Sequence, residues 1–176
     1  LKSKHKNDLL RLVMKQKVTD EIIKKFDTIN DWINNKKKSF PQIFYTSVDL
    51  RESMFKYASI DTNIFPAGFN NLHQSNLDSI KEQCNSYIKT NYPECKKILL
   101  LCEDHTRNTF YLDNISNLAN FIQLSGYEVI IGAFLKDHTG ICKENGFITL
   151  TTASQNDITI HCLNFIKKNN KDLNID

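Results

Sequence analysis

The strongest structural signal in this chain comes from residues 97–135, KILLLCEDHTRNTFYLDNISNLANFIQLSGYEVIIGAFL. Its first six residues, KILLLC, are a continuous apolar run of the kind found in a strand buried on both faces. Residues 110–125 then place apolar side chains at helical spacing, and Gly126 follows where a helix C-cap glycine belongs. Residues 127–135 are a second apolar run. Strand, helix and strand in this order predict a parallel unit with a right-handed crossover.

The rest of the chain extends this pattern in both directions. The predicted elements are helices at 4–17, 19–36 and 76–90, a β-branched and aromatic strand at 42–48, and a hairpin formed by strands at 146–152 and 157–163. The predicted fold class is therefore α/β. We expect a parallel βαβαβ open sheet, Rossmann-like, with N-terminal helices and a C-terminal β-hairpin.

Composition narrows the class of protein further. The chain has 176 residues and a net charge of +3, with 40% hydrophobic content. These values are typical of a globular domain, and the dispersed lysines do not resemble a nucleic-acid footprint. No apolar run approaches the roughly 20 residues of a membrane span, so a soluble, cytoplasmic protein is expected. Five cysteines without framework spacing predict reduced thiols.

A first candidate site follows the strand predicted at 42–48. Residues 49–71 combine large apolar groups with short polar ones, which suits a zwitterionic substrate. Cationic groups there can hold carboxylate or phosphate, an acidic group can hold ammonium, and amides can donate and accept. The alternative is an ordered Ω-loop held by its own Asn and Pro residues. The candidate residues are Arg51, Lys56, Asp61, Asn63, Asn70 and Asn71.

A second candidate site follows the strand predicted at 97–102. Residues 103–109, EDHTRNT, form a polar loop before a helix, where free amides and the helix dipole favour an anion. Ligands bind beyond the carboxyl ends of strands in open α/β sheets, and both loops are expected at that edge. The alternative is a polar turn that merely caps the helix. The candidate residues are His105, Arg107 and Asn108, with Tyr111 either lining the pocket or belonging to the core.

Other chemistry receives less support. Cys102 and His105 could be a nucleophile and a base, but Cys102 ends an apolar strand, where a buried thiol is the common case. His138, Cys142, His161 and Cys162 have spacing too loose for a zinc site, and we expect no metal site. The sequon at Asn114 lies inside a predicted helix. The 176 residues contain no GxxxxGK[ST], GxGxxG or GxSxG motif, so no nucleotide loop is recognised.

Two blocks, DTNIFPAGFNN at 61–71 and HTRNTFY at 105–111, resemble the proteobacterial glutamate–cysteine ligases of ATP-grasp type. The similarity covers about residues 20–163. The resemblance implies an enzyme that joins L-glutamate to L-cysteine through a γ-glutamyl phosphate, in the first step of glutathione synthesis. It implies ATP and Mg²⁺ as cofactors, held mainly by later domains that this chain lacks. No catalytic residue is assigned.

The resemblance also implies a domain plan. Residues 1–40 are expected to be helices packed on the sheet, 41–163 a pre-ATP-grasp substrate domain, and 164–176 the start of a connection to downstream domains. The chain starts at Leu1, so we expect a piece of a longer protein that is inactive alone. Eight of the ten candidate residues, all except His105 and Tyr111, are those that the resemblance implies to contact amino acid or phosphate. The alternative is a non-catalytic α/β domain that binds an amino acid or docks a partner.

Overall fold

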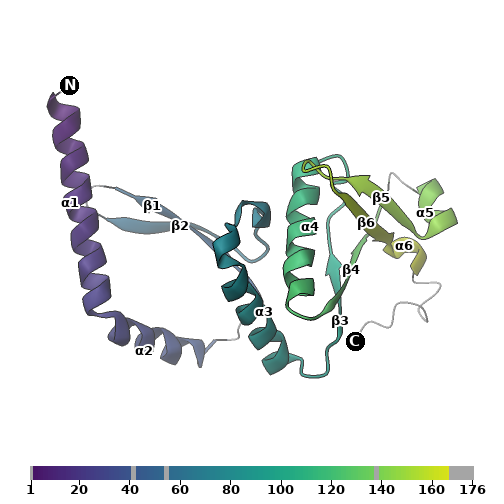
Figure 1. The fold of residues 1–176 in the computed structure, drawn as a ribbon, viewed down its shortest axis with the longest axis horizontal. Helices are drawn as coiled ribbons and strands as arrows, with labels where there is room; N and C mark the ends of the chain where they lie inside the picture. Colours follow the sequence, from purple (N-terminus) through teal and green to yellow (C-terminus); the bar gives the residue numbers. More distant parts are fainter. Residues whose placement is uncertain (1, 41–42, 54–55, 137–138, 167–176) are drawn as a thin grey trace. The chain divides into compact units, whose positions relative to one another are not determined.

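The computed structural model describes residues 2–40, 43–53, 56–136 and 139–166 (Figure 1). The chain forms two compact units, Leu1–Pro66 and Ala67–Asp176, which are described separately below. This division falls at residue 66, whereas the sequence suggested a boundary at residue 40. None of the described helices combines the length and the apolarity needed to cross a membrane.

The first unit begins with helices α1 (Lys2–Lys24) and α2 (Phe26–Lys37). Two helices were predicted here, but the break lies at Lys25 and not at residue 18. Thr19, the first residue of the second predicted helix, lies inside α1, where its hydroxyl donates to the Lys15 carbonyl oxygen at 3.0 Å, one turn earlier. A hydroxyl bonded to the carbonyl oxygen four residues earlier is typical of a threonine inside a helix and not at its start. None of the side chains described in this unit is buried.

The rest of the first unit is a hairpin of β1 (Ser47–Glu52) and β2 (Tyr57–Asn63). Residues 49–71 were expected to form a loop, and this prediction is wrong for the part that forms the hairpin. Polar and apolar residues alternate along that part with the period of two that a half-solvated strand requires. Pairing puts Val48 opposite Thr62 and Asp49 opposite Asp61. The hairpin is a separate two-stranded sheet, so the predicted first strand does not join the parallel sheet.

The second unit contains the strand–helix–strand motif that residues 97–135 predicted. Strands β3 (Lys97–Leu101) and β4 (Glu128–Ala133) are parallel and are joined by helix α4 (Thr109–Leu124). The four-stranded sheet has the order β3-β4-β6-β5. The α/β class and the C-terminal hairpin are confirmed, since β6 (Asp157–Cys162) is parallel to β4 and antiparallel to β5 (Phe147–Thr151). The remaining elements are 3-10 turns η1 (Phe69–Asn71) and η2 (Gln74–Asn76) and helices α3 (Leu77–Asn91), α5 (Thr139–Asn145) and α6 (Leu163–Ile166).

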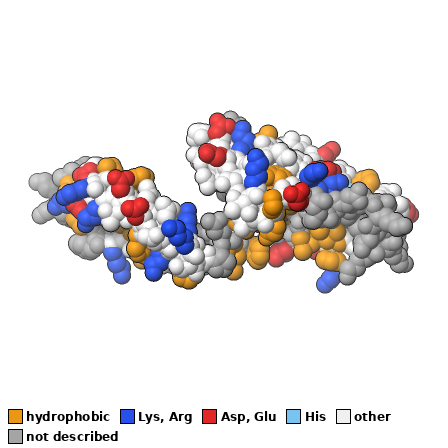
Figure 2. All heavy atoms as spheres, turned by 90° about the horizontal axis from the view of Figure 1, so that it is seen from below, with side chains coloured by type: hydrophobic (Ala, Val, Ile, Leu, Met, Phe, Trp, Pro, Cys, Tyr) orange, Lys and Arg blue, Asp and Glu red, His pale blue; other side chains and the backbone are white. Residues whose placement is uncertain are grey.

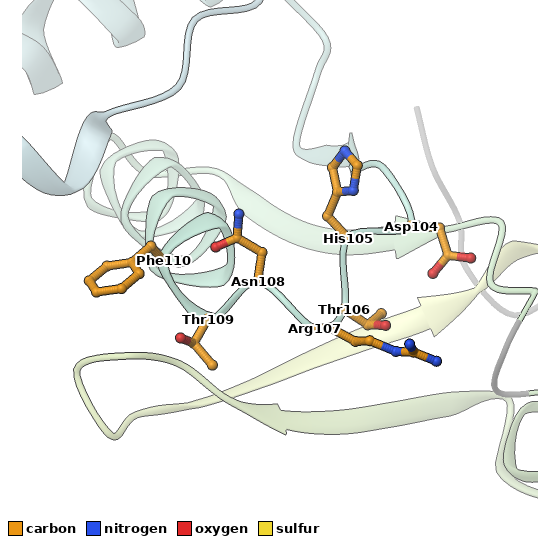
Figure 3. A pocket seen from close by; sticks show the side chains of 7 residues that line it. All are labelled: Asp104, His105, Thr106, Arg107, Asn108, Thr109 and Phe110. Atoms are coloured by element: carbon orange, nitrogen blue, oxygen red, sulfur yellow. The ribbon is translucent and has the colours of Figure 1, made fainter.

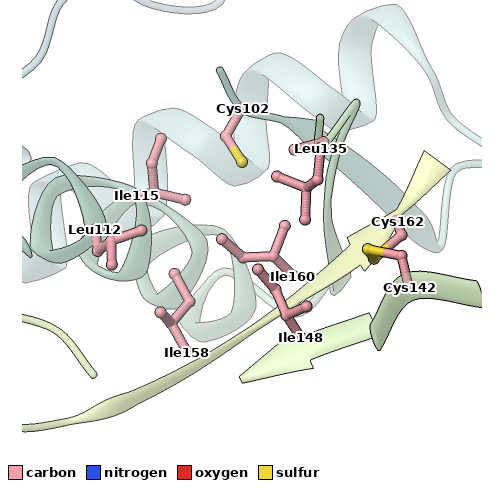
Figure 4. Close-up of a cluster of buried hydrophobic side chains, with 10 residues drawn as sticks. Cys102, Leu112, Ile115, Leu135, Cys142, Ile148, Ile158, Ile160 and Cys162 are labelled. Atoms are coloured by element: carbon pink, nitrogen blue, oxygen red, sulfur yellow. A yellow bond between two sulfur atoms is a disulfide. The ribbon is translucent and has the colours of Figure 1, made fainter. Parts of the chain in front are cut away.

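The core of the second unit lies between α4 and the sheet (Figure 4). Its ten buried members are Cys102, Leu112, Ile115, Ala133, Leu135, Cys142, Ile148, Ile158, Ile160 and Cys162. Gly132 in β4 instead leaves room for Leu163 of α6, because a Cβ atom there would lie 2.8 Å from Leu163 Cδ2 and 3.0 Å from Leu99 Cδ1, two residues outside this core. On the face seen in Figure 2, acidic and basic side chains are interspersed, in agreement with the small net charge.

One pair of cysteines departs from the prediction of reduced thiols. Cys142 of α5 and Cys162 of β6 form a disulfide across a separation of 20 residues (Figure 4). The prediction was wrong for this pair because the β5–β6 hairpin brings the two positions together, which spacing in the sequence does not reveal. Cys84, Cys95 and Cys102 are free. His138, which was weighed for zinc with Cys142, His161 and Cys162, lies outside the described residues.

A buried carboxylate connects α4 to the β5–β6 hairpin. Asp113 is 5% exposed, and its Oδ2 accepts hydrogen bonds from the backbone N and the Oγ of Ser154, both at 3.1 Å. The backbone N of Ala153 also donates to the Thr109 carbonyl oxygen at 3.2 Å. The turn between β5 and β6 is therefore held on α4 by bonds to both its backbone and a side chain.

Candidate functional site

The loop after β3 leads into α4, and together with the first residues of that helix it lines an open hollow of about 550 Å³ (Figure 3). The loop leaves the carboxyl end of a parallel strand, as predicted for this candidate site. In the view of Figure 3, the Arg107 and Asp104 side chains extend to the same side of the loop, whereas His105 extends away from them. The lining residues are Asp104, His105, Thr106, Arg107, Asn108, Thr109 and Phe110.

Asn108 fixes where the helix begins. Its Oδ1 accepts a hydrogen bond from the backbone N of Tyr111 at 3.1 Å, so it is the N-cap of α4. Asn108 therefore caps the helix, as the alternative interpretation of this loop proposed. The cap uses only Oδ1, so the Nδ2 group can donate to a ligand. The N–H groups of Thr109 and Phe110 belong to the first turn, where the helix supplies no carbonyl partner. These donors give the hollow a preference for anions.

The rings of His105, which lines the hollow, and Tyr111, which does not, pack together and support the loop. The His105 ring packs edge-on against the Tyr111 ring with 5.3 Å between centroids, and His105 Nε2 lies 2.7 Å from Glu103 Oε2. The Tyr111 hydroxyl accepts a hydrogen bond from the Glu103 backbone N at 2.9 Å. Tyr111 is half-buried and is not among the residues that line the hollow. Its contacts therefore make it a support of the loop.

Asp104 places a carboxylate at the rim of the same hollow. Its Oδ2 accepts a hydrogen bond from the backbone N of Lys136 at 3.0 Å, which connects the loop after β3 to the segment after β4. Its Oδ1 is buried without a hydrogen-bond partner in the described part of the chain. Asp104 belongs to the polar loop predicted as the second candidate site, although it was not among the residues predicted to bind substrate. A carboxylate beside Arg107 supplies the charge that an ammonium group would need.

Cys102 is a buried thiol at the end of β3, in agreement with the non-catalytic interpretation. It is 7% exposed. Burial, with a smaller contribution from the negative charge of Asp104, raises the pKa of the Cys102 thiol to about 11, although a backbone hydrogen bond opposes the shift. At neutral pH only about one thiol in ten thousand would be ionised. Cys102 therefore lacks the thiolate character of a nucleophile.

In the ligase reaction that the sequence resemblance implies, we expect Cys102→Ser to leave the rate within about threefold of wild type, because a buried thiol that stays protonated is a poor nucleophile. Its effect should appear as a small loss of thermal stability, since a hydroxyl replaces a buried sulfur. Steady-state kinetics and thermal melts of the same preparation measure both. A rate loss of about 10⁴-fold, typical of a removed nucleophile, would contradict this assignment.

Part of the first candidate site belongs to the second unit. Asn70 and Asn71 lie in η1, and this turn packs on α4 through the preceding residues. Asn114 Oδ1 of α4 accepts hydrogen bonds from the backbone N of Gly68 at 2.6 Å and of Phe69 at 2.8 Å. The bonds from Asn114 to this turn were not predicted from the sequence. An amide within the inward stripe of a helix was the available signal.

The other four candidates lie in the hairpin of the first unit. Arg51 is on β1, Lys56 precedes β2, and Asp61 and Asn63 share one face of β2; all four are exposed. Arg51 and Arg107 were predicted to follow strands of the same parallel sheet. This prediction is wrong for Arg51, because β1 is not a strand of that sheet. The second unit therefore contains six of the ten candidates: Asn70, Asn71, His105, Arg107, Asn108 and Tyr111.

Comparison with known proteins gives a match to a family model and a match to a solved structure. The family model GshA, glutamate-cysteine ligase, matches residues 19–175. A crystal structure of a protein from Methylobacillus flagellatus KT, assigned as a gamma-glutamylcysteine synthetase, is 30% identical with a TM-score of 0.75 over 84% of this chain. The chain spans 34% of the length of that protein. No curated protein matches the chain. Because the family model covers most of its length, the chain belongs to the glutamate–cysteine ligase family.

Proposed function

We propose that this chain is part of an ATP-dependent glutamate–cysteine ligase that forms γ-glutamylcysteine. In the proposed reaction, ATP phosphorylates the γ-carboxylate of L-glutamate, and the amine of L-cysteine displaces phosphate from the acyl phosphate. The observation that carries the proposal is the hollow at the start of α4, lined by Arg107 and Asn108, in a chain of this family. Its donors suit the carboxylate and phosphate oxygens that this reaction handles.

Within the hollow, we assign to Arg107 the contact with two oxygens of one bound anion. A guanidinium group holds two oxygens of one carboxylate or phosphate at once, and lysine cannot reproduce that geometry. Asn108 Nδ2 and the first-turn amides of α4 would donate to the same anion, whereas Asp104 could hold the ammonium group of an amino acid. Asn70 and Asn71 would supply further directed hydrogen bonds. We also propose substrate contacts by four residues of the hairpin in the first unit: Arg51, Lys56, Asp61 and Asn63.

We propose that ATP and Mg²⁺ are held mainly by other parts of the enzyme. The donors in the hollow fit phosphate oxygens, so this chain could contact the transferred group. Among the described residues, no three His, Cys, Asp or Glu side chains converge as a metal cluster. Bound Mg²⁺ would neutralise the charge of the phosphates during transfer.

The test is a turnover assay on the whole protein with ATP, Mg²⁺ and each amino acid alone or together. We expect ADP release that requires both L-glutamate and L-cysteine, and a product with the mass of γ-glutamylcysteine. Amino-acid binding without turnover would favour the alternative, a non-catalytic binding domain. Turnover with a different pair of substrates would overturn the assignment of substrates.

A further inference from the structure

Asn114 is a buried polar residue of α4 that the proposed chemistry does not use. It is 5% exposed and lies between Asp113 and Ile115 in the buried part of the helix. A buried amide destabilises a fold unless its polar atoms are paired. Here one atom, Oδ1, receives two backbone N–H groups at 2.6 and 2.8 Å. Both donors come from Gly68 and Phe69, more than 40 residues earlier in the chain.

The segment held in this way is a tight turn with its own internal bonds. Gly68 has φ +101°, a conformation that side chains with a Cβ rarely adopt, and its carbonyl oxygen accepts from the Asn71 backbone N at 2.9 Å. The Phe69 ring packs against Phe121 of α4 with 6.2 Å between centroids. Two hydrogen bonds and one aromatic contact therefore fix the turn on the helix, while the Asn70 and Asn71 side chains remain exposed.

The same helix also determines the geometry of the hollow. Asn108 caps α4 and Tyr111 supports the loop that carries Arg107. Asn114 lies less than one turn beyond Tyr111, so one rigid element connects the Asn70–Asn71 pair to the Arg107 loop. An acceptor at position 114 thus determines where two amide side chains lie relative to a guanidinium group.

We propose that Asn114 is a positioning residue for amino-acid binding, acting through the turn at Gly68–Asn71 and not by contact with the substrate. This inference rests on the proposed function. Loss of the acceptor would release two backbone N–H groups and let the turn move, which weakens binding of an α-amino acid by Asn70 and Asn71. The chemical step itself would be unaffected.

The kinetic test compares three variants of the whole protein. Asn114→Leu has a similar volume but no acceptor, Asn114→Asp keeps the acceptor oxygen, and Asn120→Leu makes the same change at an exposed position of α4. Below the melting temperature of each variant, we expect Asn114→Leu to raise the KM for one amino acid about tenfold with kcat within about twofold. Asn114→Asp should restore KM to within about threefold, and Asn120→Leu should match wild type.

A second measurement reports the anchor without activity. Hydrogen exchange of the peptide that covers residues 67–72 should be at least about tenfold faster in Asn114→Leu than in Asn120→Leu, because Gly68 and Phe69 lose their acceptor. If Asn114→Leu does not fold, Asn114→Ser replaces it, since a serine hydroxyl is too short to reach both amides. Unchanged exchange would overturn the anchor, and faster exchange with an unchanged KM would overturn the positioning role. A wild-type protein that forms no γ-glutamylcysteine would instead overturn the proposed function, and with it the substrate role.

Discussion

Arg107→Lys is expected to lower kcat/KM for the proposed formation of γ-glutamylcysteine by roughly 10- to 150-fold. Lysine keeps the positive charge but loses the planar fork that can hold two oxygens of one anion. A hydrogen bond to a charged group contributes about 1.5–3 kcal/mol, which corresponds to this range of rates. Because Arg107 lies in an exposed loop, the melting temperature should change little. Kinetics with glutamate, cysteine and ATP varied in turn, beside thermal melts, measure both effects.

Of the other two arginines, Arg11 supplies a control for the Arg107 variant and Arg51 a second test. Arg11→Lys makes the same chemical change in α1, outside both candidate loops, and should leave kcat/KM within about twofold. Arg51→Lys tests whether the hairpin contributes to the site, and a loss similar to that of Arg107→Lys would support its inclusion. Near-normal kinetics for Arg107→Lys would remove Arg107 from the site and with it the proposed role of the hollow.

Asp113→Ala should destabilise the second unit by about 2–3 kcal/mol, because a buried carboxylate loses its hydrogen bonds to Ser154 and leaves a small cavity. For a protein of this size, the melting temperature should fall by roughly 5–10 °C. Urea unfolding followed by circular dichroism gives the free energy directly. The kinetics of the folded variant should stay near those of wild type, since Asp113 does not line the hollow beside Arg107.

Ser154→Ala is the matched control for Asp113→Ala. It removes only the Oγ donor and keeps the backbone N–H that Asp113 also accepts, so the expected loss is about 1 kcal/mol. Asp113→Asn should fall between the two, because it keeps an acceptor oxygen but not the charge. A loss below about 0.5 kcal/mol for Asp113→Ala would mean that water replaces the carboxylate and that the hairpin turn does not depend on it.

Residues 97–135 could be predicted well because several signals agree there. Apolar runs set the strands, helical spacing sets α4, and Gly126, with φ +99°, follows the end of that helix. Residues 49–63 could not be predicted in the same way. Their polar content resembles that of a binding loop. In the structure, polar and apolar residues alternate along β2, which pairs with β1. Pairing partners depend on tertiary context, which a single sequence does not contain.

The candidate site shows the same division between local and long-range information. Asn108 as a helix cap and Cys102 as a buried thiol follow from neighbouring residues, and the structure agrees with both. The anchor at Asn114 and the disulfide between Cys142 and Cys162 depend on contacts between positions far apart in the chain. A local pattern can mark Asn114 as an inward-facing amide, but it specifies no distant partner, so these contacts became visible only in the folded molecule.

Helix α4 has a further consequence for how this family can vary. Three segments attach to it through polar atoms: the loop after β3 at Asn108, the β5–β6 turn at Asp113, and the Gly68 turn at Asn114. A substitution that shifts the helix axis must move all three attachments together, because each is bonded to the same rigid rod. Divergence of the loops is therefore tolerated more easily than divergence of the helix. In a set of related sequences, positions 108, 113 and 114 should change together or not at all.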